Sequence, residues 1–195
     1  MAKVAYTRKL SLIALFTALA YILNVAISIP APYADFLIYE VWEVPILLSL
    51  LLLDFTAGAA VAFLNMMVLE VVKPGPLPTG PVYNFLAIIS MFAGVLAAER
   101  LSSGRGRVAA VGLATLLGGA SRTLVMTVVN ALVLPQPYPV GFSIPVAALP
   151  ALLALIGVFN FTTAVYTVPL AYTVKEAVVS RTRAAGWLKP AKVQA

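Results

Sequence analysis

Long apolar runs, separated by short stretches rich in proline, glycine or charge, dominate the chain. The apolar runs lie near residues 8–28, 41–54, 56–72, 81–100, 107–134 and 146–176. A helix of about 20 apolar residues is long enough to cross the roughly 30 Å hydrocarbon core of a bilayer. The pattern therefore predicts an all-α membrane protein with six transmembrane helices. The second and third runs leave one alternative open, because residues 44–72 are also consistent with a single long span.

The distribution of basic residues favours six spans over five. Lysine and arginine gather in three clusters, at residues 3–9, 100–107 and 175–192. With six spans all three clusters lie on one side of the membrane, which the positive-inside rule identifies as the cytoplasm, whereas five spans would divide them. We therefore predict cytoplasmic N- and C-termini and a tight cytoplasmic turn at Asp54.

The same pattern sets the domain organisation. Residues 1–180 are interpreted as one six-helix transmembrane domain in the cell (plasma) membrane. Residues 181–195 are interpreted as a basic cytoplasmic tail, which acts as a topology signal with weak attraction to anionic lipid.

Composition agrees with a membrane protein and excludes several functional classes. Of the 195 residues, 62% are apolar and 10% are charged, whereas soluble domains carry about 25% charged residues. A soluble enzyme and a nucleic-acid-binding protein are therefore excluded, despite the formal charge of +6. The chain contains no cysteine or histidine, P-loop motif or carboxylate pair within one predicted helix. We accordingly expect no enzyme activity, catalytic residue, metal site or cofactor.

Polar residues within the predicted helices are the best candidates for a binding site, because polar side chains are costly in hydrocarbon. Asn84, Asn130 and Asn160 are all expected near the outer ends of their helices, below outer loops that carry Tyr33 and Tyr39. A carboxamide offers a donor beside an acceptor, which suits the edge of a neutral heterocycle, while aromatic rings provide stacking. An interhelical hydrogen bond explains any one of these asparagines equally well, and an interfacial aromatic belt explains any one tyrosine.

Arg122 lies in the fifth predicted helix and requires a partner, because an unpaired charge within the membrane is costly. We expect an intramembrane charge pair with Glu70 or, alternatively, with Glu43. Direct contact with a carboxylate group of a ligand is the less favoured interpretation.

Ala14 and Ala18 lie one turn apart in the first predicted helix. Small residues at this spacing form a flat face on which another helix can pack closely. The face therefore serves either internal packing or docking to a partner membrane protein.

Four segments of the chain resemble the substrate-binding S components of energy-coupling factor (ECF) vitamin transporters, most closely the riboflavin-type members. The segments are Ile29-Pro-Ala-Pro32 followed by Glu43-Val-Pro45, Gly80-Pro-Val-Tyr-Asn-Phe85, Val129-Asn130-Ala-Leu-Val-Leu-Pro135 and Gly157-Val-Phe-Asn160. The resemblance extends from about Leu12 to Val174, and it rests on the order and spacing of the segments more than on any one motif.

This resemblance implies a six-helix bundle whose vitamin pocket opens outward below the first loop. Transport would then require a separate transmembrane coupling protein and two ATPase subunits, with Ala14 and Ala18 on the docking face. Carried over by position, the substrate-binding residues would be Asn84, Asn130, Asn160, Thr163, Tyr39, Glu43 and Tyr33. Thr163 stands where riboflavin-type members usually have a lysine, so riboflavin is the first candidate and another vitamin is the alternative.

Two other functional classes remain open from the sequence. A self-sufficient secondary transporter for a small aromatic metabolite would show repeated halves with broken helices, or a buried acid that carries protons. The sequence shows no clear repeat, and Glu70 is the candidate carrier. A structural or assembly subunit would bind no small molecule.

The predicted topology can be tested by cysteine labelling in intact cells, because the chain has no cysteine of its own. A cysteine introduced at Ser103 is expected to be protected from a membrane-impermeant reagent, and one introduced at Leu77 is expected to react. Labelling of Ser103 from outside would contradict the topology.

Overall fold

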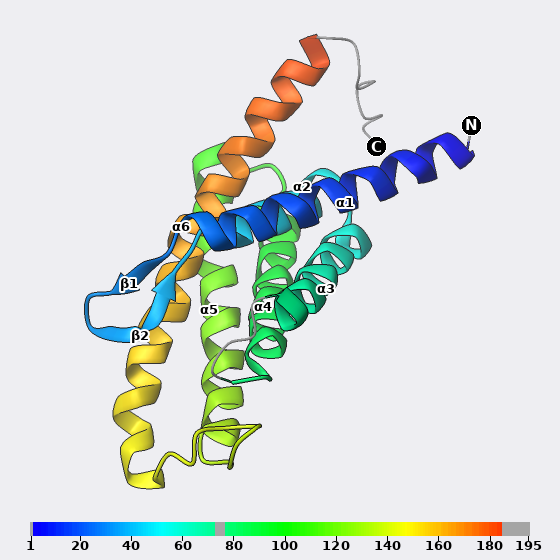
Figure 1. Ribbon diagram of the computed structural model, residues 1–195. Helices are drawn as coiled ribbons and strands as arrows, with labels where there is room; N and C mark the ends of the chain where they lie inside the picture. Colours follow the sequence, from blue (N-terminus) through cyan, green and yellow to red (C-terminus); the bar gives the residue numbers. More distant parts are fainter. Residues whose placement is uncertain (1, 73–76, 185–195) are drawn as a thin grey trace.

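The computed structural model describes residues 2–72 and 77–184 (Figure 1). Within these residues the chain forms six α-helices, one short 3-10 helix and one β-hairpin. The elements are α1 (Ala2–Ala26), β1 (Ile29–Ala31), β2 (Ala34–Tyr39), α2 (Glu43–Leu52), α3 (Phe55–Val72), α4 (Gly80–Leu101), α5 (Arg107–Val133), η1 (Val146–Ala148) and α6 (Leu149–Ala184). Most of the tail expected at residues 181–195 lies outside the described residues.

Five of the described helices are long and apolar enough to cross a membrane, namely α1, α3, α4, α5 and α6 with η1. The chain is therefore a membrane protein. The sixth helix, α2, has 10 residues and spans only about 15 Å, half of a hydrocarbon core. The expected second span is thus a short helix, and six full spans and cytoplasmic termini remain predictions.

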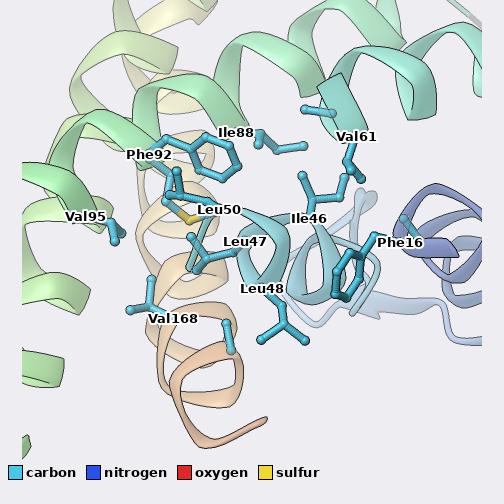
Figure 2. Close-up of a cluster of buried hydrophobic side chains, with 14 of the residues drawn as sticks. Phe16, Ile46, Leu47, Leu48, Leu50, Val61, Ile88, Phe92, Val95 and Val168 are labelled. Atoms are coloured by element: carbon cyan, nitrogen blue, oxygen red, sulfur yellow. The ribbon is translucent and has the colours of Figure 1, made fainter. Parts of the chain in front are cut away.

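The short helix α2 forms the centre of the bundle. Every residue from Pro45 to Leu50 is buried, and the helix packs against α1, α3, α4 and α6. Figure 2 shows Ile46, Leu47 and Leu50 of α2 in contact range of side chains from these neighbours, including Phe92 of α4. A helix that is apolar on all sides is typical of a position surrounded by protein, so α2 contributes little surface to lipid.

Helices α4 and α5 approach each other closely at Gly94. A Cβ atom built on Gly94 would lie 2.1 Å from the carbonyl oxygen of Leu117 and 2.7 Å from the Cα of Gly118. Only glycine fits at this position, because the obstacle is the backbone of α5 and not a flexible side chain. Small residues at a contact between two membrane helices permit this close packing. The contact fixes the position of α5, which packs between α4 and α6.

The tight turn predicted at Asp54 is present between α2 and α3, and its cytoplasmic location stays a prediction. Oδ1 of Asp54 accepts a hydrogen bond from the backbone N–H of Ala57 at 2.9 Å, which caps the N-terminus of α3. Lys9 of α1 donates to the same carboxylate at 2.7 Å. These hydrogen bonds, the one from Lys9 first, hold the pKa of Asp54 below its usual range. The turn therefore ties α1 to the junction of α2 and α3.

The first loop contains a β-hairpin that the all-α prediction did not include. Strands β1 and β2 are antiparallel, with Ile29 opposite Tyr39 and Pro30 opposite Ile38. Phe36, Ile38 and Tyr39 of β2 favour a strand, and β1 tolerates Pro30 because both strands of a two-stranded hairpin are edge strands. Figure 1 shows the hairpin beside α6, where β2 contacts that helix.

Side-chain contacts hold neighbouring segments together at the two ends of the bundle. At one end, Thr79 before α4 donates a hydrogen bond to the carbonyl oxygen of Pro139, at 3.1 Å. At the other end, Arg107 of α5 forms an ion pair with Glu176 of α6. The residues just before α4 and the loop between α5 and α6, both expected outside, are thus adjacent. For the labelling test, Tyr138 is 69% exposed and more accessible than Leu77, which is 6% exposed.

Candidate functional site

A buried ionic network at the centre of the bundle joins three helices. Arg122 of α5 forms an ion pair with Glu43 of α2 through both of its terminal nitrogens, and Nη2 lies 2.9 Å from Oε1. Its Nε donates to Oδ1 of Asn160 on α6, at 3.0 Å. Arg122 is 3% exposed, and Glu43 and Asn160 are each 4% exposed. The charge of Arg122 is therefore fully compensated inside the protein.

This network corrects one sequence-based expectation and selects its alternative. Arg122 pairs with Glu43, whereas Glu70 is exposed on α3. The position of Glu43 favours it as the partner of Arg122, because Glu43 is the first residue of α2. The N-terminus of a helix carries a partial positive charge that stabilises a carboxylate. Removing one partner of a buried ion pair typically costs about 3 to 5 kcal/mol, so the network strongly constrains where α2 begins.

A layer of aromatic side chains lies where the hairpin contacts α6. The ring of Tyr39 is 4.9 Å from that of Phe159 and 6.1 Å from that of Tyr166. The hydroxyl groups of Tyr33 and Tyr39 are 2.5 Å apart. Burial, together with the hydrogen bond to Tyr39, raises the pKa of Tyr33 to about 12. The contact between the two hydroxyl groups ties the turn of the hairpin to the end of β2.

Glu40 anchors the segment between the hairpin and α2. Its Oε2 accepts hydrogen bonds from Asn24 of α1 at 3.1 Å and from Trp42 at 2.8 Å. Its backbone carbonyl accepts a hydrogen bond from the hydroxyl of Tyr166, at 2.7 Å. Sequence reasoning missed Glu40, Asn24 and Tyr166. The sequence did offer one indication of this role. Glu40 and Glu43 flank Trp42, so two carboxylates lie just before an apolar helix, where each needs a partner.

The three predicted carboxamides differ in their environments. Asn160 is buried, and its Nδ2 donates to the carbonyl oxygen of Ile156 at 2.9 Å. Asn130 is half-buried and donates to the carbonyl oxygen of Met126 at 2.7 Å. Asn84 is exposed on α4. Of the three, the structure brings only Asn160 into the network with Arg122.

Thr163, one turn after Asn160, is 2% exposed. Its hydroxyl donates to the carbonyl oxygen of Phe159 at 2.9 Å. This hydrogen bond uses the O–H donor of Thr163 within α6, whereas its oxygen keeps the capacity to accept a hydrogen bond. Thr163 lies between Phe159 and Tyr166 of the aromatic layer in the sequence.

The small-residue face of α1 is directed away from the bundle. Ala14 and Ala18 are exposed, as are Leu15 and Ile22, whereas Phe16 points into the core. The alternative in which Ala14 and Ala18 pack inside this chain therefore does not apply to the described residues. Docking on this face remains a prediction.

Comparison with known proteins gives a match in fold. No family model matches the chain, and no curated protein matches it in sequence. The chain is similar to a solved structure described as the S component of a bacterial ECF transporter, with a TM-score of 0.74 and 21% identity over 90% of this chain and 97% of that chain. The chain has the fold of an S component. At this level of identity the match shows the fold alone.

The role of Asn160 within the S-component fold can be tested by comparing Asn160→Leu with Asn130→Leu. Asn160→Leu leaves the buried Nε–H of Arg122 without an acceptor, which is expected to cost about 1 to 3 kcal/mol of stability. Asn130→Leu removes only a hydrogen bond within its own helix and is expected to cost less. Thermal unfolding of the purified variants in detergent measures the difference. Equal melting temperatures for the two variants would show that the contact with Arg122 contributes nothing.

Proposed function

We propose that the chain is the membrane-embedded substrate-binding subunit of an ECF-type importer in the plasma membrane. The observation that carries the proposal is the S-component fold, which extends over nearly the whole chain. The aromatic layer on α6 and the buried network beneath it add a site with rings and hydrogen-bonding groups. The proposed ligand is a small vitamin captured from outside, with riboflavin as the first candidate.

The state of Arg122 favours a neutral ligand over an acidic one. Its guanidinium group already binds the carboxylate of Glu43 and the amide oxygen of Asn160. A carboxylate on the ligand would have to displace Glu43, leaving that residue buried without a partner at a cost of several kcal/mol. We therefore expect the site to prefer a neutral heterocycle.

We propose that rings beside the hairpin and amides on α4 and α5 supply the contacts that such a heterocycle needs. Tyr39 and Phe159 offer aromatic faces, and stacking between aromatic groups contributes about 0.5 to 1.5 kcal/mol beyond burial. Asn130 uses one N–H within its helix, and its amide also carries a second N–H and an oxygen with two lone pairs. Asn84 and Asn130 thus keep hydrogen-bonding groups available for a ligand held between α4, α5, α6 and the hairpin.

The carboxylates argue against a self-sufficient secondary transporter. A proton carrier in a membrane transporter is typically a buried acidic residue that changes its protonation state. Glu43 is the buried carboxylate among those that the structure describes, and it is held by Arg122. Glu70, the candidate carrier from the sequence, is exposed. Uptake is therefore proposed to depend on a separate transmembrane coupling protein and two ATPase subunits.

Ligand titration tests the proposed site. Riboflavin is expected to quench the tryptophan fluorescence of the purified chain. Asn130→Leu is expected to weaken the complex by about 5- to 150-fold, because a polar edge of the ligand loses its partner. Asn65→Leu is the matched control, since it removes the same group from α3, which packs against α1, α2 and α4. No quenching by riboflavin, together with quenching by an acidic vitamin, would contradict the preference for a neutral ligand.

Reconstitution in liposomes tests whether the chain binds its ligand by itself but needs other subunits to transport it. The chain alone in liposomes is expected to bind ligand but not to accumulate it, even with a proton or sodium gradient. Uptake is expected only with the coupling protein and its ATPases. Replacing Ala14 and Ala18 together by leucine enlarges the docking face, and such overpacking typically costs about 1 to 3 kcal/mol of association.

The alanine variants need a matched control on other exposed surfaces. Ala93→Leu combined with Ala120→Leu alters exposed alanines on α4 and α5 instead. Assembly and uptake are expected to fall only in the α1 variant, while ligand affinity stays near the original value. Gradient-driven uptake by the chain alone would support the secondary-transporter alternative.

A further inference from the structure

An open groove runs between the first half of α5 and the middle of α6. Its volume is about 660 Å³, within the roughly 300 to 1,000 Å³ of small-molecule sites. Most of its lining is apolar and includes Val108, Val111, Leu116, Phe161, Val165 and Pro169. None of the residues assigned to the vitamin site lines it. The groove is therefore a separate feature of the molecule.

Gly112 forms part of the groove wall where no other side chain fills the space. A Cβ atom built on Gly112 meets nothing within 4 Å. The neighbouring Val108 and Leu116 are 86% and 54% exposed. The described chain thus leaves a long apolar surface on α5 without a protein partner.

One end of the groove is basic. Arg107 belongs to its lining and forms an ion pair with Glu176. Lys175 lies 3.7 Å from Glu99 at the same end, and Arg105 is exposed in the adjoining turn. A guanidinium group has five N–H donors, so its pairing with one carboxylate leaves donors for a phosphate group.

The length of the groove matches one leaflet of a bilayer. Nine residues separate Arg107 from Leu116 on α5, which corresponds to about 14 Å along the helix axis. Half of a hydrocarbon core is about 15 Å. The apolar wall therefore reaches from the charged end of the bundle to about the middle of the membrane.

We propose that this groove binds an anionic phospholipid, with its phosphate at Arg107 and an acyl chain along Val111, Leu116 and Val165. A lipid supplies an anion and an apolar chain in one molecule, which matches the basic end and the apolar wall. Basic pockets between membrane helices are a recognised setting for anionic headgroups. This site is independent of the vitamin site and of the identity of the vitamin.

Photo-crosslinking in lipid nanodiscs tests the proposal on the full chain. Phosphatidylglycerol and phosphatidylcholine, each with the same photoreactive acyl chain, are incorporated in turn, and labelled peptides are quantified. Peptides covering residues 108–116 and 161–169 are expected to be labelled about fivefold more by phosphatidylglycerol. Arg107→Gln is expected to abolish this preference without reducing labelling by phosphatidylcholine.

Gly112→Leu tests the apolar wall, because a leucine fills the groove and is favourable within a helix. It is expected to reduce labelling of the groove by both lipids, whereas Ala120→Leu, at an exposed position further along α5, leaves labelling unchanged. If Gly112→Leu does not fold, the proposal is tested by Arg107→Gln alone, which is expected to lose the preference for phosphatidylglycerol.

Several results would overturn the proposal. Equal labelling by the two lipids would exclude recognition of the headgroup. Labelling spread evenly over all lipid-facing helices, or unchanged in Gly112→Leu, would show general lipid contact only. If Gly112→Leu abolished assembly with the coupling protein but left lipid labelling intact, the groove would be a protein interface instead.

Discussion

The buried charge of Arg122 is the constraint on which the rest of this structure depends. A guanidinium group at the centre of a membrane bundle is stable only when a carboxylate and further acceptors surround it. Glu43 and Asn160 meet that need from two other helices. The network therefore fixes the relative positions of α2, α5 and α6, and it leaves the centre of the bundle electrically neutral.

The position of Glu43 links this network to the outer surface. Because Glu43 begins α2, the preceding segment must descend to the depth of Arg122 and cannot remain at the membrane surface. Glu40 secures that segment through Asn24, Trp42 and Tyr166. The hairpin then rests on α6, with Tyr39 against Phe159. The proposed preference of the ligand site for neutral compounds follows from this ion pair, and the aromatic rings come from the hairpin and α6.

The long helices could be predicted from the sequence because their boundaries are marked by proline, glycine and charge. The structure places α4 at Gly80–Leu101 and α5 at Arg107–Val133, close to the apolar runs that predicted them. The apolar run at residues 41–54 predicted α2 at Glu43–Leu52. A run of leucines that is apolar on every side suits a span and a central core helix alike, so the sequence did not show that α2 is surrounded by protein. The hairpin was missed because β1 has only three residues and contains Pro30.

The candidate site was harder to predict because it depends on the rotation of each helix about its axis. Glu43 and Glu70 both precede Arg122 by more than 50 residues, so the sequence does not rank them, and only the packing shows that Glu70 is exposed. Asn84 and Asn160 were expected at one depth, but depth does not determine which face a residue occupies. Asn160 joins the network and Asn84 is exposed. The sequence therefore predicted that Arg122 needs an acidic partner, but it did not show which of the two glutamates would pair with it.

A double-mutant cycle on the ion pair tests the central claim most directly. The free energies of unfolding of Glu43→Gln, Arg122→Met and the double variant are compared with that of the original chain in one detergent. Each single change leaves a buried polar group or charge without its partner, whereas the double change removes the pair. A coupling of about 2 kcal/mol or more is expected, with the double variant more stable than the sum of the two losses implies. Losses that add to within about 0.5 kcal/mol would contradict the account.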